Sequence, residues 1–178
     1  MMTILFPRLG SLELKPYEAP FGRMMLAFGR ATVAAIELVE KCKGSEAEAV
    51  LFVGTAGTKD LPKSLRKLFS NKLDKEQDAK LRHAAGEYKA VGDKRHHLIH
   101  GEWWFNVFEN GGLNVRRARS QTIKGRPKTI KEKKRVLIIE NIEVVSPTDL
   151  DDWATKLNTV ADDFDDLAWQ YSVGGGDR

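Results

Sequence analysis

Apolar residues recur at three- and four-residue spacing along most of the chain, and this spacing is the period of amphipathic α-helices. The predicted helical segments are residues 20–44, 45–57, 62–71, 74–100 and 147–173. Residues 1–15 lack this period and are expected to be extended or irregular. Pro20 suits the first turn of the first helix, where a missing N–H costs nothing. The pattern therefore predicts a mainly α protein.

Residues that favour helix starts support these boundaries. Ser45 with Glu48, and Asp74 with Gln77, have the spacing of a capping box, in which side chains bind free N–H groups of the first turn. The last helix carries a seven-residue apolar repeat, which predicts a narrow seam that packs on the other helices or on a second subunit. The seam consists of Leu150, Trp153, Leu157, Val160, Phe164, Leu167 and Tyr171.

The apolar period changes to two after Gly101. Alternation over residues 103–108 and the turn signal at 110–112 predict a β-hairpin over about residues 102–118. The β-branched runs between 136 and 145 are candidates for a further strand, after a basic loop over about residues 120–135. We therefore expect one domain over residues 1–178, a helical bundle with an inserted β-hairpin or small antiparallel sheet.

Composition restricts the class of protein. The chain has 178 residues, of which 42% are hydrophobic and 30% charged, as in ordinary globular domains. It contains no apolar run of membrane-spanning length and no secretory leader, so we expect a cytoplasmic protein with no membrane partner. The single Cys42 cannot form an internal disulfide. Its only nearby cations in the sequence are Lys41 and Lys43, so we do not expect it to act as a nucleophile.

Charge is unevenly distributed, although the net charge is only +4. Ten basic residues before and within the predicted loop are candidates for nucleic-acid binding, whereas the last helix is rich in Asp. The candidates are Arg116, Arg117, Arg119, Lys124, Arg126, Lys128, Lys131, Lys133, Lys134 and Arg135. The alternatives are docking of opposite charges within or between chains, and a solvated loop. A smaller basic face, Lys59, Lys63, Arg66, Lys67 and Lys72, is usually just solvated but could add to an RNA surface.

Arg95 occupies a position where the 74–100 helix should bury an apolar side chain. The stripe runs through Leu81, Ala84, Ala85, Tyr88, Val91, Leu98 and Ile99. At about 100° per residue, His96 and His100 lie about 100° and 140° around the helix from Arg95, and His97 faces almost directly away. His100 is also near the helix C-terminus, where the dipole favours a protonated imidazole. A charge at such a position needs a partner and often marks a functional site.

Several interpretations of this cluster stay open. His96 and His100 have the spacing of zinc ligands, with His97 or Glu102 as a third, but Arg95 would repel the cation. The cluster could instead be a structural polar layer bound to an acidic residue. Gly92, one turn before His96, either lets a substrate approach or makes room for a neighbouring helix.

The Arg95-His96-xxx-His100 pattern resembles the signature of the HEPN superfamily (higher eukaryotes and prokaryotes nucleotide-binding). The next residues, Gly101-Glu102-Trp103, are similar to small bacterial members with a hairpin after the motif helix. The resemblance implies a four-helix bundle, a homodimer with both motifs in one cleft, and catalytic roles for Arg95, His96 and His100. The family's polar position is often Asn or Asp, and some members only bind nucleotides or proteins. Outside residues 74–118 the likeness is architectural.

The function expected from this resemblance is a metal-independent endoribonuclease that uses the RNA 2′-OH as nucleophile, needs no cofactor, and acts in a toxin–antitoxin or phage-defence setting. The partners implied are RNA, a second copy of the chain and a neutralising antitoxin protein. The alternative is a noncatalytic helical module that binds RNA or a protein.

Overall fold

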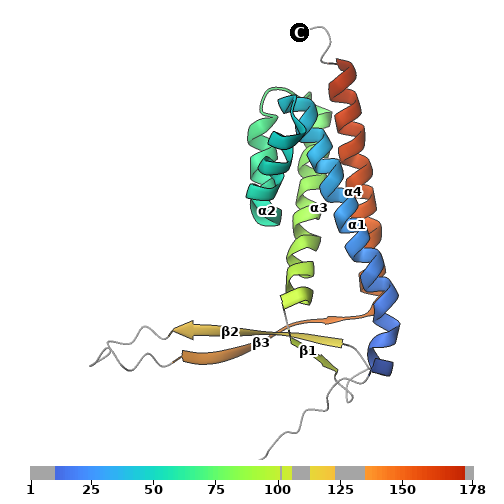
Figure 1. Cartoon of the computed structure of the whole chain (residues 1–178), viewed down its shortest axis with the longest axis vertical. Coiled ribbons are helices and arrows are strands. Elements are labelled where there is room, and N and C mark those ends of the chain that lie inside the picture. The colour runs from blue at the N-terminus through green and yellow to red at the C-terminus, as the bar shows by residue number, and fades with distance from the viewer. Residues whose placement is uncertain (1–10, 101, 106–112, 123–134, 175–178) are drawn as a thin grey trace, which may run out of the picture. The chain divides into compact units, whose positions relative to one another are not determined.

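The chain is mainly helical in the computed structural model, which describes residues 11–100, 102–105, 113–122 and 135–174 (Figure 1). The helices are α1 (Ser11–Lys43), α2 (Glu46–Leu68), α3 (Lys75–His100) and α4 (Pro147–Gly174), and the strands are β1 (Glu102–Phe105), β2 (Leu113–Thr122) and β3 (Arg135–Val145).

The chain divides into two compact units. The first, here called the helical unit, comprises Lys15–Lys94 and Pro147–Arg178, and the second, the sheet unit, comprises Met1–Leu14 and Arg95–Ser146. α3 contributes to both, because its last turns belong to the sheet unit. The single domain expected from the sequence stays a prediction.

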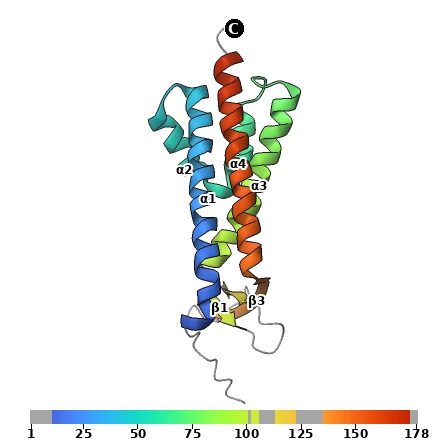
Figure 2. The same cartoon turned by 90° about the vertical axis from the view of Figure 1, so that its right-hand side faces the viewer.

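In the helical unit, α1 and α4 run parallel and side by side (Figure 2). Arg23 pairs with Asp151 at 2.8 Å, and further along both helices Arg30 pairs with Asp162 at 2.5 Å. α3 runs in the opposite direction to α4, since Lys80 lies 2.8 Å from Asp166. At the other end of this contact, Lys94 lies over the ring of Trp153. Charged pairs between helices therefore mark their relative direction and register.

The apolar seam predicted for α4 is buried inside the chain. Leu150, Leu157 and Phe164 are fully buried, and Tyr171 is half-buried. Alanines beside the seam, such as Ala161, are buried as well and widen it. Of the two partners considered for this seam, the other helices of the same chain are the one observed.

α1 begins earlier than expected. Residues 11–15 are helical, so the prediction that they are extended or irregular is wrong for this stretch. Pro16 and Pro20 lie inside the helix and not in its first turn. Tyr17 and Pro20 are buried, and Met24 follows on the same face at helical spacing. This burial offsets the two backbone hydrogen bonds that the prolines cannot donate.

α2 consists of two helical segments joined by a kink. Gly57 has φ 55° and ψ −177°, a conformation that only glycine adopts readily. The sequence predicted two short helices separated here, and the observed break agrees with that prediction. The Ser45 side chain accepts a hydrogen bond from the N–H of Glu48, and Asp74 and Gln77 bond reciprocally, as the capping patterns indicated.

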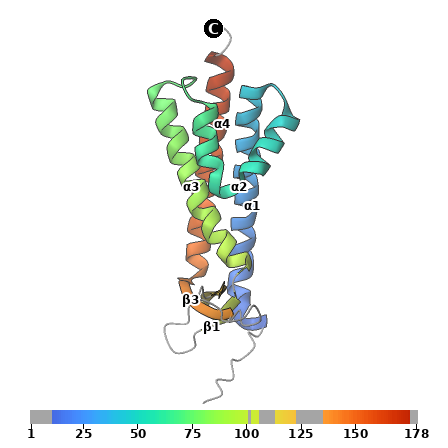
Figure 3. The ribbon, with the colours of Figure 1, turned by 90° about the vertical axis from the view of Figure 1, so that its left-hand side faces the viewer.

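Gly92 brings α2 and α3 into close contact. A Cβ at this position would lie 2.0 Å from Thr58 Cγ2 and 3.3 Å from the Phe28 ring. Phe28 also stacks on Tyr88, whose hydroxyl lies 2.8 Å from Thr32 Oγ1. The neighbouring helix fills the space beside Gly92, so of the two explanations for this glycine, close helix packing is correct and substrate approach is wrong. Figure 3 shows α2 and α3 together on one side of the α1–α4 pair.

The sheet unit contains a three-stranded antiparallel sheet in the order β1-β2-β3. Trp104 is the register partner of Asn114, and Thr122 is the partner of Arg135. The pairing shifts between Val115 and Arg116. The turn that would complete the expected hairpin, including residues 110–112, lies outside the described residues.

Replacing Gly92 with Ala is expected to destabilise the protein by about 1–3 kcal/mol, because the new methyl group overlaps Thr58. The matched control is Gly86→Ala on the same helix, where nothing lies within 4 Å of the new Cβ. This control should stabilise the protein by about 1 kcal/mol, since Ala is the better helix former. Urea unfolding of both variants measures the difference, and an equal shift for the two would contradict the packing at Gly92.

The Arg23–Asp151 pair predicts a pH-dependent contribution to stability. Its hydrogen bond lowers the pKa of Asp151 below the ordinary value of 3.8. A lowered carboxyl pKa stabilises the fold above 3.8, and this contribution disappears as the pH falls through the folded pKa. The Asp151→Asn variant should therefore unfold at lower urea than wild type at neutral pH, with a small difference because the pair is exposed, and no difference below the lowered pKa.

Asp152→Asn serves as the control for this measurement. Among the described residues the exposed Asp152 forms no ion pair, so its replacement should leave the unfolding midpoint nearly unchanged at neutral pH. A loss for Asp151→Asn that persists unchanged in acid would show that the pair is not its cause.

Candidate functional site

The last turns of α3 carry the Arg-His cluster on an uninterrupted helix. Val91 and Leu98 are buried, and Arg95 lies between them on the helix face and is half-buried. The apolar stripe thus continues past a guanidinium, as the sequence predicted. Ile99, which was assigned to the same stripe, is 40% exposed and lies at its margin.

His96 is exposed, whereas the side chains of His97 and His100 lie outside the part of the chain that the structure describes. The backbone is helical through His100, so His96 and His100 occupy positions one turn apart. Residues at this spacing are neighbours on a helix surface. The helical frame expected for Arg95, His96 and His100 is therefore present, and their side-chain contacts stay a prediction.

Asp93, two residues before Arg95 in the sequence, forms an ion pair within α3. Asp93 Oδ2 accepts a hydrogen bond from Lys89 Nζ, one turn back along α3. The intervening Lys94 lies with its Nζ 4.5 Å from the centre of the Trp153 ring, a cation–π contact that the sequence pattern did not indicate. Both residues thus fix the polar side of α3 just before the cluster.

The metal interpretation is not decided by the structure. Among the residues with described side chains, no three of His, Cys, Asp or Glu come together as a metal site. The ligands considered for zinc with His96 were His100 and either His97 or Glu102, and the side chains of these three lie outside that set.

The ten basic candidates for nucleic-acid binding lie on β2, at the start of β3, or between these two strands in the sequence. Arg116, Arg117 and Arg119 lie on β2, and Arg135 begins β3. Arg117 is the register partner of Glu140. Because Thr122 and Arg135 are partners, the two ends of the basic segment meet across this strand pair. The other candidates lie outside the described residues: Lys124, Arg126, Lys128, Lys131, Lys133 and Lys134.

Most acidic residues of α4 have partners within the helical unit. Asp151 and Asp162 pair with arginines of α1, while Asp163 and Asp166 pair with Lys80 of α3. The hydrogen bond to Asp166 also raises the pKa of Lys80. These carboxylates connect α4 to α1 and α3. The acidic composition of α4 therefore has an explanation that does not require docking of the basic loop over about residues 120–135.

Cys42 has a cationic neighbour that the sequence did not reveal. Lys72 Nζ lies 3.1 Å from Cys42 Sγ, and the Tyr171 hydroxyl lies 3.9 Å from it. The hydrogen bond to Cys42 raises the pKa of Lys72. The expectation that Lys41 and Lys43 are the only nearby cations is wrong, because the connection after α2 turns back at Asn71, with φ 63°, and brings Lys72 to α1.

Comparison with family models finds no match for this chain, and comparisons with curated proteins and with solved structures find none either. The resemblance to HEPN proteins therefore rests on the Arg95-His96-xxx-His100 pattern and its helical setting alone. Among the described residues, no helix combines the length and the apolar character needed to cross a membrane.

Proposed function

We propose that the protein is a metal-independent endoribonuclease of the HEPN type, with Arg95, His96 and His100 as its catalytic residues. The observation that carries this proposal is that the whole Arg95-His96-xxx-His100 pattern lies on one uninterrupted helix, with Arg95 half-buried between two buried apolar residues. A fixed positive charge in such a position requires nearby negative charge or polar groups. A planar guanidinium can also bind the oxygens of a phosphodiester through paired hydrogen bonds.

The chemistry needs only groups that these residues supply. A base takes the proton of the ribose 2′-OH, and the 2′-oxygen then attacks the adjacent phosphorus. The bond from phosphorus to the 5′-oxygen breaks, and that oxygen receives a proton from an acid. The products are a 2′,3′-cyclic phosphate and a 5′-hydroxyl, so no water or metal-bound hydroxide is consumed in this step.

Each residue has a role that fits its chemical type. His100 transfers protons, because an imidazole changes protonation near neutral pH. Arg95 binds the phosphate oxygens with its planar guanidinium and stabilises the added charge of the transition state. His96 is exposed, and in the proposal it orients the phosphate or assists the proton transfer.

The basic residues support RNA as the substrate. β2 carries three of these residues, Arg116, Arg117 and Arg119. Arg135, at the start of β3, is the register partner of Thr122 at the end of β2. Positive charge gathered on one strand pair attracts the phosphate backbone without reading a particular sequence. The toxin–antitoxin or phage-defence setting, and a neutralising antitoxin protein, are proposed from the family resemblance.

Wild-type protein is expected to cleave single-stranded RNA in the presence of EDTA, and the products should carry 2′,3′-cyclic phosphate ends. Arg95→Ala and His100→Ala should each reduce the rate by a factor of about 100 or more, since each removes a group that acts in the transition state. Electrophoresis of end-labelled RNA measures the rate, and mass spectrometry identifies the ends.

Two histidines of α3 provide matched controls. His97→Ala changes the position that faces away from Arg95 in the helix, and His83→Ala changes an exposed histidine well before the motif. Both variants should keep near wild-type rates. Cleavage that requires added metal, or equal loss in all four variants, would exclude the proposed mechanism.

The second candidate function is a noncatalytic module that binds RNA, and the concentration of basic residues on β2 and β3 favours it. In this case RNA binding would persist in wild type and in Arg95→Ala, and no cleavage would occur under any condition. The same gel and a binding measurement in EDTA separate the two functions.

The proposed mechanism also includes a homodimer in which two motifs share one cleft. The mass in solution should then be twice the 20.0 kDa of one chain. Light scattering coupled to size exclusion measures this mass. A monomer that retains full cleavage activity would reject the shared cleft while leaving the catalytic residues in place.

A further inference from the structure

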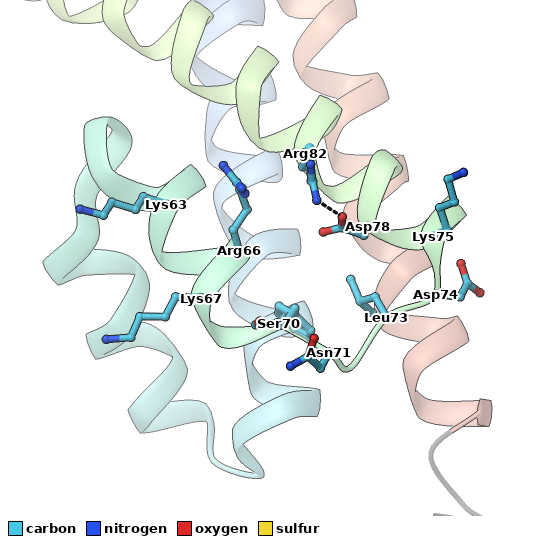
Figure 4. A pocket seen from close by; sticks show the side chains of 11 residues that line it. Lys63, Arg66, Lys67, Ser70, Asn71, Leu73, Asp74, Lys75, Asp78 and Arg82 are labelled. Atoms are coloured by element: carbon cyan, nitrogen blue, oxygen red, sulfur yellow. Dashed lines mark hydrogen bonds and ion pairs between the residues drawn. The ribbon is translucent and has the colours of Figure 1, made fainter.

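The helical unit has a basic cleft where α2 ends and α3 begins, with a volume of about 560 Å³ (Figure 4). Five cationic residues line it, against two carboxylates. The cationic residues are Lys63, Arg66, Lys67, Lys75 and Arg82, and the acidic ones are Asp74 and Asp78. None of these residues belongs to the Arg95–His100 segment or to the sheet unit.

Both carboxylates of the cleft already have structural roles. Asp78 pairs with Arg82 one turn further along α3. Asp74 caps the start of α3, where its Oδ1 accepts a hydrogen bond from the N–H of Gln77 at 2.8 Å. The two carboxylates thus have contacts within α3, and the five cations of the cleft outnumber them.

Three cations of the cleft differ in their pairing from the cations that bind α4. Lys63, Arg66 and Lys67 are exposed, and within the described part of the chain none of them forms an ion pair. In contrast, Arg23 and Lys80 bind carboxylates of α4. Lys63 and Lys67 are also one turn apart, where like charges repel each other. The cleft thus gathers three exposed cations that form no ion pair with a described residue.

Arginines reach this cleft from two helices. Arg66 belongs to the last turn of α2 and Arg82 to the second turn after the start of α3, and Figure 4 shows Arg66 extending from the end of α2 while Arg82 points toward Asp78. Guanidinium groups bind phosphate oxygens through paired hydrogen bonds. The lysines continue the positive charge along α2, and this arrangement suits a ligand with repeated negative charges better than a single small anion.

We infer that this cleft binds the phosphate backbone of the RNA substrate, through Arg66, Lys67 and Lys63 with Arg82 beside them. The choice of RNA as the polyanion rests on the proposed function. The cleft would hold the substrate by contacts that carry no sequence information, and its role is positioning and not bond cleavage.

The test compares two double variants that remove the same charge. Arg66→Gln with Lys67→Gln changes the cleft, and Lys15→Gln with Lys41→Gln changes two exposed lysines outside it. Both are made in a His100→Ala chain, so that turnover does not consume the probe. Fluorescence anisotropy with a labelled single-stranded RNA of mixed sequence, in EDTA and at several salt concentrations, measures binding. Circular dichroism and urea unfolding check that each variant is folded.

The cleft double variant should bind RNA about tenfold more weakly, and the slope of log affinity against log salt should fall by roughly 1.4, from about 0.7 for each lost phosphate contact. The control double variant should keep the wild-type slope. Equal weakening of both, or an unchanged slope for the cleft variant, would overturn the inference. Displacement of the RNA by polyglutamate at equal charge would also overturn it, by indicating an acidic protein segment as the ligand.

The nuclease proposal can fail separately from this one. If wild type binds RNA through the cleft but never cleaves it in EDTA, the cleft is retained and the proposed catalysis is rejected. If cleavage occurs and the cleft variant binds normally, only the cleft is rejected.

Discussion

The close contact of Thr58 and Phe28 with Gly92 determines how α3 packs. With no side chain at position 92, the kinked helix α2 can approach α3 until Thr58 fills the space of a missing Cβ. Phe28 of α1 reaches the same place and stacks on Tyr88. One position thus brings three helices together. α3 continues as a helix to His100, and Arg95 comes three residues after Gly92. The packing at Gly92 therefore fixes the direction around the helix in which position 95 faces.

Two sets of charged residues in the helical unit differ in what they contact. Pairs such as Arg23 with Asp151 and Lys80 with Asp166 connect α4 to its neighbours. These pairs are half-exposed or exposed, so each contributes little energy, but together they restrict the register of helices whose contacts are otherwise apolar. The second set consists of the cations at the α2–α3 cleft. Within this cleft, Lys63, Arg66 and Lys67 form no ion pair with a described residue, in contrast to the cations that bind α4.

Local sequence patterns correctly predicted the features that depend on residues close together in the chain, namely helix caps, a helix break and a buried face. The reciprocal bonds of Asp74 and Gln77, the break at Gly57 and the buried seam of α4 all follow from spacing within one helix or turn. Contacts between distant segments were not predictable in this way. Lys72 reaches Cys42 only because of the turn at Asn71, and nothing near Gly92 in the sequence indicates that Thr58 fills its space.

At the candidate site too, local features were predictable from the sequence and contacts with distant segments were not. Spacing alone predicted that Arg95 interrupts a buried stripe, and Arg95 is half-buried with Val91 and Leu98 buried on either side. Spacing does not give the partners of these side chains, since those come from other elements. The start of α1 was missed for a related reason: Pro16 indicates a helix boundary by itself, while the burial of Tyr17 depends on helices far away in the sequence.

Under the proposed function, the residue types at the end of α3 suit chemistry better than a purely structural polar layer. A structural layer needs charges that balance and then stay constant. A guanidinium keeps its charge over the ordinary pH range, whereas imidazoles in general gain or lose theirs near neutral pH. Such a pair is poorly suited to holding a fixed charge balance. It is well suited to binding a permanent anion while a proton moves beside it, which is what cleavage of a phosphodiester by its own 2′-OH requires.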